Sequence, residues 1–302
     1  MQIATEARPS FRSSTHRPGS LGLIKEAFSE AFRRRRLVRY LVQADIKRKG
    51  SDSLLGNLWW VLDPLLEMGV YIILLVVIFQ RKTPDFPLFI FCALLPWKWF
   101  ASSIGESTAS VVRQEKLIKQ LQFPKIVFPI AAITAQIVNL FFGTIILMVM
   151  LFVAYPQHAT INMLWLPFIA LVQWVFTLGL SLIVASVNVF YRDVGILSGH
   201  LIRMWWFLSP GIWSFSGGGR FETIESALGP FVVILKYNPF AVLLTAYRDV
   251  IYGRVDDTGN SFTPGQPPDL IALGVLLVLS MGLVVLGALV FKRLEPAFAK
   301  VL

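Results

Sequence analysis

Apolar residues gather along this chain in six runs separated by shorter polar stretches. A helix crosses the hydrocarbon core of a bilayer with about 20 predominantly apolar residues. The runs cover residues 58–80, 87–107, 126–155, 164–189, 201–215 and 270–291. The pattern predicts an all-α integral membrane protein with six transmembrane helices. The fifth run is short and carries Pro210 and Gly211 near its end, so we expect a broken backbone there, covered by protein or lining a cavity.

The connection before the last run, residues 217–269, contains two apolar stretches that are too short to cross a bilayer. They cover residues 228–235 and 240–246. We expect them to form two short re-entrant helices in an external loop. The glycines at 217–219 are expected to form a hinge, and residues 256–268, rich in Gly, Pro and Asp, an exposed segment with turns.

Residues 21–41 precede the first run and separate apolar from charged side chains, with Leu23, Ala27, Ala31 and Phe32 on the apolar side. This pattern favours an amphipathic helix on the cytoplasmic surface of the membrane, with a merely solvated basic helix as the alternative. The first 20 residues are polar and lack the apolar stretch of a cleavable signal peptide. We therefore expect a disordered basic tail, an amphipathic helix with its connector, a transmembrane domain and a cytoplasmic tail, over residues 1–20, 21–56, 57–291 and 292–302.

Composition agrees with a membrane protein. The chain is 55% hydrophobic and 15% charged, with a mean hydropathy of +0.65. Soluble domains average about 45–50% apolar and about 25% charged residues. The one cysteine, Cys92, lies inside an apolar run, so it excludes a disulfide framework and is expected to be a small buried hydrophobe.

Basic residues are concentrated near one end of the chain, where the first 56 residues hold 12 of the 28. Counted by alternate connections between the runs, 21 basic residues fall on one side of the membrane and six on the other, with Lys98 inside a run. Basic residues accumulate on the cytoplasmic side, so both termini are predicted to be cytoplasmic in a multi-pass protein of the bacterial plasma membrane. This placement of the net charge of +10 favours contact with anionic lipid over nucleic acid. The expected cytoplasmic interface residues are Arg33, Arg34, Arg35, Arg36, Lys47 and Arg48.

The sequence carries no pattern of catalytic chemistry. It lacks the Gly-x-x-x-x-Gly-Lys-Ser/Thr loop that holds nucleotide phosphates and the Gly-x-Ser-x-Gly turn of serine hydrolases. Its three histidines lie in separate regions without further ligands at metal-binding spacing. Charged residues within the runs are too few for a proton-coupled carrier. We therefore expect no catalytic, cofactor-binding or metal-binding residue, and a transport role that takes its energy from another protein.

Three groups of residues, in this order and spacing, carry a resemblance to a known family. They are Asp45-Ile46-Lys47-Arg48-Lys49-Gly50-Ser51 with Asp63-Pro64-Leu65-Leu66, then Leu117-Ile118-Lys119-Gln120-Leu121-Gln122-Phe123-Pro124-Lys125, then Asn188-Val189-Phe190-Tyr191-Arg192-Asp193 with Tyr237-Asn238-Pro239 and Tyr247-Arg248-Asp249. From about residue 37 to its end, the chain resembles the permease subunit of type-2 ABC exporters. The most similar group handles lipid-linked polysaccharides such as O-antigen, teichoic acid, capsule and galactan.

The resemblance implies a homodimer of six-span permeases docked on two copies of a separate ATPase, which binds ATP and Mg²⁺. It implies a lipid-linked polysaccharide as the substrate, moved outwards from the cytoplasm. It also implies a coupling helix at about 112–123 that seats in the ATPase, with Glu115, Lys116, Lys119 and Gln122 as contact residues. Independently, Glu115 and Lys119 are spaced for a pair on one helix turn, and Pro124 stops that helix. An ordinary loop helix is the alternative.

Two acids in the first run, Asp63 and Glu67, are unusual because a carboxylate in hydrocarbon is costly. They either pair with Lys98 or a cytoplasmic arginine, or line an aqueous entrance for the sugar–pyrophosphate head of the substrate. The resemblance implies that Pro64 kinks a gate-forming first helix. The first two spans line the pathway in the family, so the aromatic residues on them are pathway candidates: Trp59, Trp60, Trp97 and Phe100. An interfacial aromatic belt and ordinary packing are the alternative.

Two other functions remain open from the sequence. A type-2 exporter of drugs or small lipids shares the transmembrane pattern but usually lacks the basic amphipathic start. A membrane glycan polymerase or transferase needs acidic clusters on large external loops, and only Asp256-Asp257 offers one.

Overall fold

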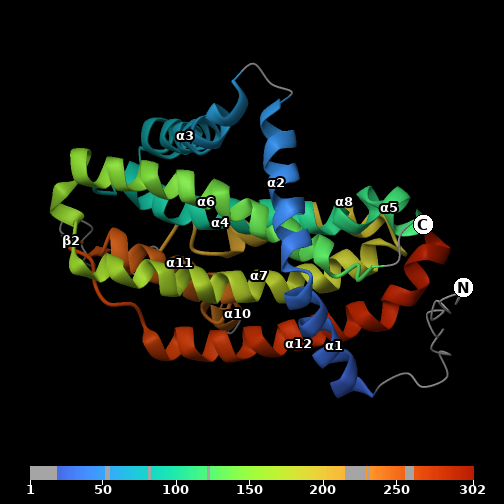
Figure 1. Ribbon diagram of the computed structural model, residues 1–302. Coiled ribbons are helices and arrows are strands. Elements are labelled where there is room, and N and C mark those ends of the chain that lie inside the picture. The colour runs from blue at the N-terminus through green and yellow to red at the C-terminus, as the bar shows by residue number, and fades with distance from the viewer. Residues whose placement is uncertain are drawn as a thin grey trace, which may run out of the picture.

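The computed structural model describes residues 19–51, 55–80, 83–120, 123–214, 229, 232–255 and 262–302. Long helices run side by side through the molecule, and the chain ends near the short helix α5 (Figure 1). Strand structure in the described ranges is confined to one antiparallel pair, β1 (Arg254–Val255) with β2 (Phe262–Thr263). The protein is all-helical in character, as predicted. Residues 1–18 of the expected tail, the glycines at 217–219 and residues 256–261 of the turn-rich stretch lie outside the described residues.

Five helices of the described ranges are long and apolar enough to cross a membrane. They are Trp59–Ile78 (α3, Trp59–Ile72, continued by the π-helical η2, Ile73–Ile78), α4 (Phe86–Arg113), α6 (Val127–Ala154), Ile161–Asn188 (η4, Ile161–Trp165, with α7, Leu166–Asn188) and α12 (Leu270–Val301). The fifth predicted run corresponds to α8 (Asp193–Leu208), which begins earlier than predicted and has 16 residues. Its length of about 24 Å is below the roughly 30 Å of a hydrocarbon core.

Helix α4 forms the centre of the fold. It packs against α3, α6, α7, α8 and the short helix α11 (Pro239–Ile251), and its side chains Leu88, Ile90 and Phe91 are fully buried. At its N-terminal end, His158 of η3 (Pro156–His158) lies 2.8 Å from Asp85 and 2.7 Å from the carbonyl oxygen of Tyr252. This cluster ties the start of α4 to the end of α11.

Glycines set the contact between α7 and α12, the most extensive helix pair. A Cβ on Gly179 would lie 2.8 Å from the backbone of Leu283 and Val284, and one on Gly287 would lie 2.6 Å from the carbonyl oxygen of Gly179. Small residues let membrane helices approach closely and gain dispersion energy. The two helices are therefore held backbone to backbone.

Helix α11 starts at mid-depth in the bundle and runs to its edge. Asn238 caps its first turn, accepts from Trp205 Nε1 at 2.7 Å, and donates to Ser209 Oγ at 2.8 Å, so α11 starts where α8 ends. Phe240 packs on Trp97 near the middle of α4, with ring centroids 4.8 Å apart. A second short helix, α10 (Val232–Lys236), precedes it. Both helices lie where short helices were predicted.

The expected N-terminal amphipathic helix is present but divided. A turn at Arg34 separates α1 (Ser20–Arg33), which packs on α12, from α2 (Arg35–Ser51), which packs on α6. Figure 1 shows both helices crossing the long helices transversely. Ala27 of the predicted apolar face is buried, whereas Phe32, predicted on the same face, is exposed. The helical structure therefore extends to Ser51 and not only to residue 41.

Candidate functional site

The two acids of the first span meet one lysine of the second. Lys98 Nζ on α4 lies 2.5 Å from Asp63 Oδ2 and 2.7 Å from Glu67 Oε2 on α3. The spacing of four residues places both carboxylates on one face of α3, which turns toward α4. One of the two predicted interpretations, pairing with Lys98, therefore holds for both acids. Two carboxylates and one ammonium leave this charged triad with one excess negative charge.

The triad borders a cavity of about 360 Å³ between α3, α4 and α6. Three tryptophan rings share its wall with polar and charged groups; the lining is Trp59, Trp60, Asp63, Pro64, Leu95, Lys98, Trp99, Ser102, Asn139 and Leu140. Four of the seven pathway candidates therefore lie together, and Glu67 reaches the same site through Lys98. We call this space the charged cavity. Its volume is that of ordinary small-molecule pockets, about 300–1,000 Å³.

Sequence reasoning did not find Trp99, Ser102 or Asn139 in this wall. Asn139 belongs to α6 and enters the site only because α6 packs across α4. Its amide donates to Gln136 at 2.5 Å. No local pattern marks these residues, since their role depends on how three helices pack.

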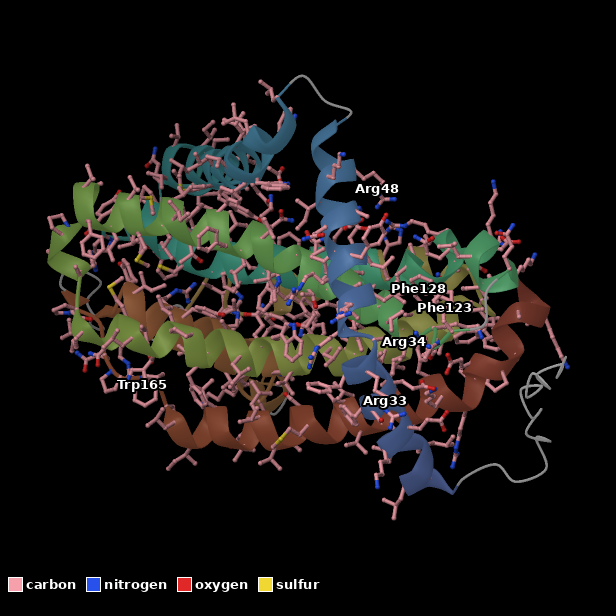
Figure 2. The ribbon with its side chains drawn as sticks, viewed as in Figure 1. Arg33, Arg34, Arg48, Phe123, Phe128 and Trp165 are labelled. Carbon is pink, nitrogen blue, oxygen red and sulfur yellow. The ribbon has the colours of Figure 1, made fainter. Side chains whose placement is uncertain are left out.

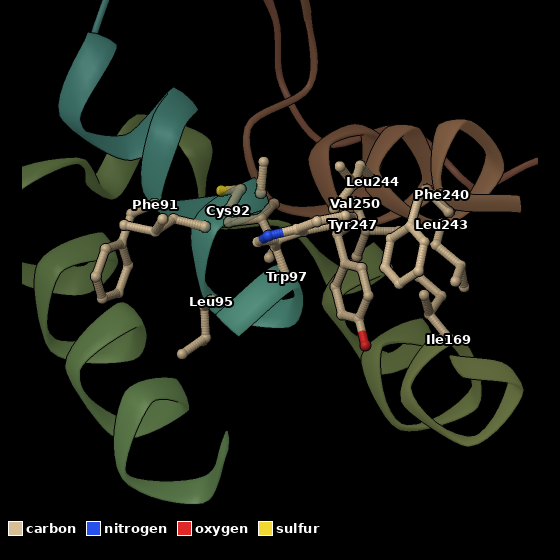
Figure 3. Close-up of a cluster of buried hydrophobic side chains, with 14 of the residues drawn as sticks. Phe91, Cys92, Leu95, Trp97, Ile169, Phe240, Leu243, Leu244, Tyr247 and Val250 are labelled. Atoms are coloured by element: carbon tan, nitrogen blue, oxygen red, sulfur yellow. The ribbon is translucent and has the colours of Figure 1, made fainter. Parts of the chain in front are cut away.

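Trp97 and Phe100 point elsewhere. Their side chains are 6% and 0% exposed and belong to the apolar core. Phe100 stacks on Phe240 with centroids 4.4 Å apart, and Trp97 packs against Trp206 at 5.3 Å. Figure 3 shows Trp97 and Phe240 within this cluster. Their contacts are those expected of packing residues, the alternative considered above.

The predicted coupling element is a short helix, α5 (Glu115–Gln120). Lys119 donates to Glu115 at 2.6 Å, so the pair predicted from the spacing is present, and this hydrogen bond and charge lower the pKa of Glu115. Lys116 is exposed, while Ile118 is buried and fixes the helix to the bundle. Gln122 lies outside the described residues. Three of the four candidate residues therefore sit on one outward-facing turn.

A cluster of charges that the sequence did not indicate fixes α1 to α12. Lys292 of α12 is 6% exposed as a side chain and pairs with Glu30, with Glu295 at 2.9 Å and with Glu26 at 3.6 Å. Burial raises the pKa of Glu30 although Lys292 opposes the rise. Glu295 also accepts from the backbone N–H of Lys125 at 2.5 Å, just after α5. We call this group the α1 anchor.

The α1 anchor joins segments that are far apart in sequence. Its two ends, α1 and α12, are separated by most of the chain, so no local spacing reveals it. Lys119 of α5 also donates to the backbone oxygen of Leu302 at 2.6 Å. Helix α1, the C-terminal part of α12 and α5 therefore meet at one end of the bundle.

The predicted interface residues are all exposed. They line the outer surface of α1 and α2, as Figure 2 shows for Arg33, Arg34 and Arg48. Arg48 also pairs with Asp45 at 2.6 Å. Beside these basic residues, Leu21, Phe28 and Phe32 form an exposed apolar stripe on α1, opposite the face that packs on α12.

In the ranges that the structure describes, no cluster of three His, Cys, Asp or Glu side chains could hold a metal ion. The site consists of aromatic rings, amides and charges, which can bind and guide a polar molecule.

Comparison with known proteins gives the family. No family model matches the chain. The O-antigen export system permease protein RfbA of Myxococcus xanthus is 32% identical over 273 residues, which are 90% of this chain and 97% of the relative. This chain belongs to the O-antigen export permeases. Two permease proteins of the same name from Klebsiella pneumoniae are 26% and 27% identical over 267 residues, which are 88% of this chain and 95% of each relative. The resemblance to type-2 ABC permeases is thus confirmed.

In this permease, Arg248 from the Tyr247-Arg248-Asp249 group connects α11 to the residues that follow α8. It donates to the carbonyl oxygens of Gly211 at 2.8 Å and Trp213 at 3.1 Å, and its guanidinium lies 3.9 Å from the ring centre of Phe89. These bonds satisfy carbonyl groups after the end of α8, where Pro210 interrupts the helix. The expected broken backbone of the fifth run is therefore covered by protein.

Proposed function

We propose that this chain is the membrane-spanning subunit of an ATP-driven exporter that moves a lipid-linked polysaccharide from the cytoplasm across the inner membrane. The observation that carries the proposal is the sequence identity of 32% to an O-antigen export permease over 90% of this chain. The charged cavity adds to it, because flat tryptophan rings, amides and carboxylates together suit a sugar chain. ATP and Mg²⁺ belong to a separate ATPase, of which two copies serve a homodimer of this permease.

The rival functions have less support. An exporter of drugs or small lipids would be expected to resemble permeases of another name. A glycan polymerase would need an acidic catalytic cluster outside the membrane, and the relatives are transport subunits by name.

We propose six crossings, which the chain direction supports. Asn188, at the end of α7, donates to Thr108 near the C-terminal end of α4. Asn162 and Gly265, bonded at 2.6 Å, lie at the opposite end of the bundle, just before α12 begins. A crossing between residues 189 and 264 accounts for this change of end, and we assign it to α8 with the residues up to 214. In this arrangement α10 and α11 re-enter from the external side to the level of Asn238, and both termini are cytoplasmic.

Labelling of introduced cysteines should reveal this topology. Thr263→Cys on β2 should react with a membrane-impermeant maleimide on intact spheroplasts, and Lys300→Cys should react only after permeabilisation. Both positions are exposed, and the native Cys92 is buried and provides the unreactive background. If only Lys300→Cys were labelled on intact spheroplasts, the orientation of the permease, and with it the direction of transport, would be the opposite of the one proposed.

Helix α5 is the docking element for the ATPase in this proposal, and α1 and α2 rest on anionic lipid through their arginines and the stripe Leu21, Phe28 and Phe32. An apolar stripe beside basic residues is typical of helices that lie in the membrane interface. The outer face of α3 and η2 is apolar and exposed, with Val70 on α3 and Val77 on η2, which leaves room for lipid or the second permease copy.

Reversing the charge of Lys116 should uncouple the exporter. Lys116→Glu changes an exposed side chain, so expression and melting temperature should stay normal. We expect the ATPase, reconstituted with the permease, to require roughly tenfold higher concentration for half-maximal stimulation, a loss of about 1.4 kcal/mol in docking. Surface polysaccharide in a deletion strain should fall in parallel.

The matched control is Lys300→Glu, which makes the same charge change on an exposed position at the same end of the molecule. It should stimulate the ATPase and restore surface polysaccharide like the unchanged permease. Equal behaviour of the two variants would assign docking to another segment. Failure of the unchanged permease to restore any surface polysaccharide would refute the proposed function itself.

A further inference from the structure

Helix α8 carries an exposed arginine, Arg203, in its second half. Within the described part of the chain, its guanidinium makes no hydrogen bond or ion pair. Arg203 lies three residues before Trp206, whose ring packs on Trp97 near the middle of α4, with ring centroids 5.3 Å apart. An ionisable side chain at such a depth in a membrane protein is costly and normally faces a polar partner or water. Arg203 therefore marks a surface that another group covers.

Arg203 and the charged triad lie at one depth. Trp206 Nε1 donates to Tyr71 Oη at 2.7 Å, which marks a common level on α8 and α3. Arg203 precedes Trp206 by three residues, and Glu67 precedes Tyr71 by four. Both helices run antiparallel to α4, so both charges lie toward the same end of the bundle, about 4.5 and 6 Å from that level at about 1.5 Å of rise per residue. Arg203 and Glu67 thus differ little in depth.

Each of these two charges flanks an apolar stripe whose side chains are more than half exposed. The stripes are Leu197, Leu201, Met204 and Leu208 on α8, and Leu66, Val70, Ile73 and Val77 on α3 and η2. Lipid covers an apolar stripe as well as protein does, so the flanking charges indicate what lies there. Charges beside the apolar seam of two paired helices set partner choice and orientation. The two stripes therefore suit each other, with opposite charges at one level.

The triad provides the acid for this pairing. Lys98 is one cation for two carboxylates, at 2.5 Å from Asp63 and 2.7 Å from Glu67. The side chain of Glu67 is 40% exposed, so a second cation can reach it from outside the protomer. With an arginine there, Lys98 keeps Asp63 and the excess negative charge of the triad is balanced.

We propose that α3 of one permease copy packs on α8 of a second copy, and that Arg203 of the second copy binds Glu67 at the edge of the charged cavity. Two copies with the same orientation in the membrane are related by a twofold axis along the membrane normal, so each residue keeps its depth in both. Such an interface is self-complementary, so the pair occurs twice. This pairing rests on the homodimer of the proposed function and specifies the helices and charges that join its copies.

Cross-linking between copies tests the arrangement. A permease with Glu67→Cys and one tag is expressed together with a permease that carries Arg203→Cys and another tag, and membranes are treated with a short bifunctional maleimide. We expect a band of twice the mass with both tags, since the second Glu67–Arg203 pair of the dimer stays unchanged. The matched control combines Glu67→Cys with Leu279→Cys on α12, an exposed position across the bundle from α3 (Figure 1), and should give no such band. The native Cys92 is buried.

A double-mutant cycle tests the ion pair. Arg203→Met should raise the dissociation constant of the dimer roughly tenfold, because two pairs are lost per dimer. The constant is measured by single-molecule photobleaching in liposomes over a range of protein-to-lipid ratios. Glu67→Gln should weaken the dimer similarly, and both changes together should cost less than their sum, because no charge is then left without its partner. Arg293→Met, the same replacement at an exposed arginine of α12, should leave the constant unchanged.

Three results would contradict the pairing. A dimer with equal cross-linking of both cysteine combinations, or with additive effects in the cycle, would refute it. If Arg203→Met kept the dimer and reduced export, Arg203 would face an anionic group of the substrate instead. A permease that stays monomeric at every protein-to-lipid ratio would refute the homodimer of the proposed function as well, whereas a dimer without the cross-link would refute the pairing alone.

Discussion

Lys98→Met should lower the free energy of unfolding of the permease by about 1–2 kcal/mol, because it leaves Asp63 and Glu67 without their shared cation beside the charged cavity. The side chains of the two acids are 64% and 40% exposed, so the loss is smaller than for a fully buried ion pair. We expect a lower melting temperature in detergent.

Two further variants test this explanation. Glu67→Leu should be nearly neutral for stability, because Lys98 keeps Asp63 at 2.5 Å. The triple variant Lys98→Met, Asp63→Asn, Glu67→Gln removes all three charges and should recover most of the lost stability. It should still export poorly if the charged cavity contacts the substrate. A stable Lys98→Met protein would show that water or lipid headgroups, and not Lys98, balance the two acids.

Lys292→Met should detach α1 from the bundle. The change leaves Glu26, Glu30 and Glu295 without their shared cation at a site where Lys292 is 6% exposed. The opening of α1 should become easier by about 3 kcal/mol or more. Proteolysis of a transiently opened segment follows the population of the open form. Trypsin should therefore cleave at Arg33–Arg36 roughly 100-fold faster than in the unchanged permease.

Arg293→Met is the matched control, since it removes the neighbouring cation, which is exposed and bonded only to Ser20 Oγ at 3.0 Å among the contacts described. Its cleavage rate should stay close to that of the unchanged permease. Adding Glu30→Gln to Lys292→Met should slow cleavage again, because one stranded charge is removed. Similar cleavage of the two single variants would mean that apolar packing around Ala27, and not the α1 anchor, holds α1.

The protein class, five of the spans, the short helices before the last span and the Glu115–Lys119 pair are predictable from the amino-acid sequence. Each rests on local patterns: apolar runs of bilayer length, and side chains four residues apart on one helix face. The family is also predictable, because its residue groups keep their order along the chain. Asp63 and Glu67 stand out in the sequence because charge in an apolar run is rare.

Which of these residues meet depends on how the helices pack. Lys98 pairs with both acids because α3 packs on α4. Trp97 and Phe100, on the same helix as Lys98, turn into the core because α11 returns to mid-depth beside them. Lys292 and Glu30 pair across 262 positions of sequence. Helical periodicity assigns a residue to a face, but which neighbour covers that face depends on contacts between distant segments, and those arise only when the helices pack.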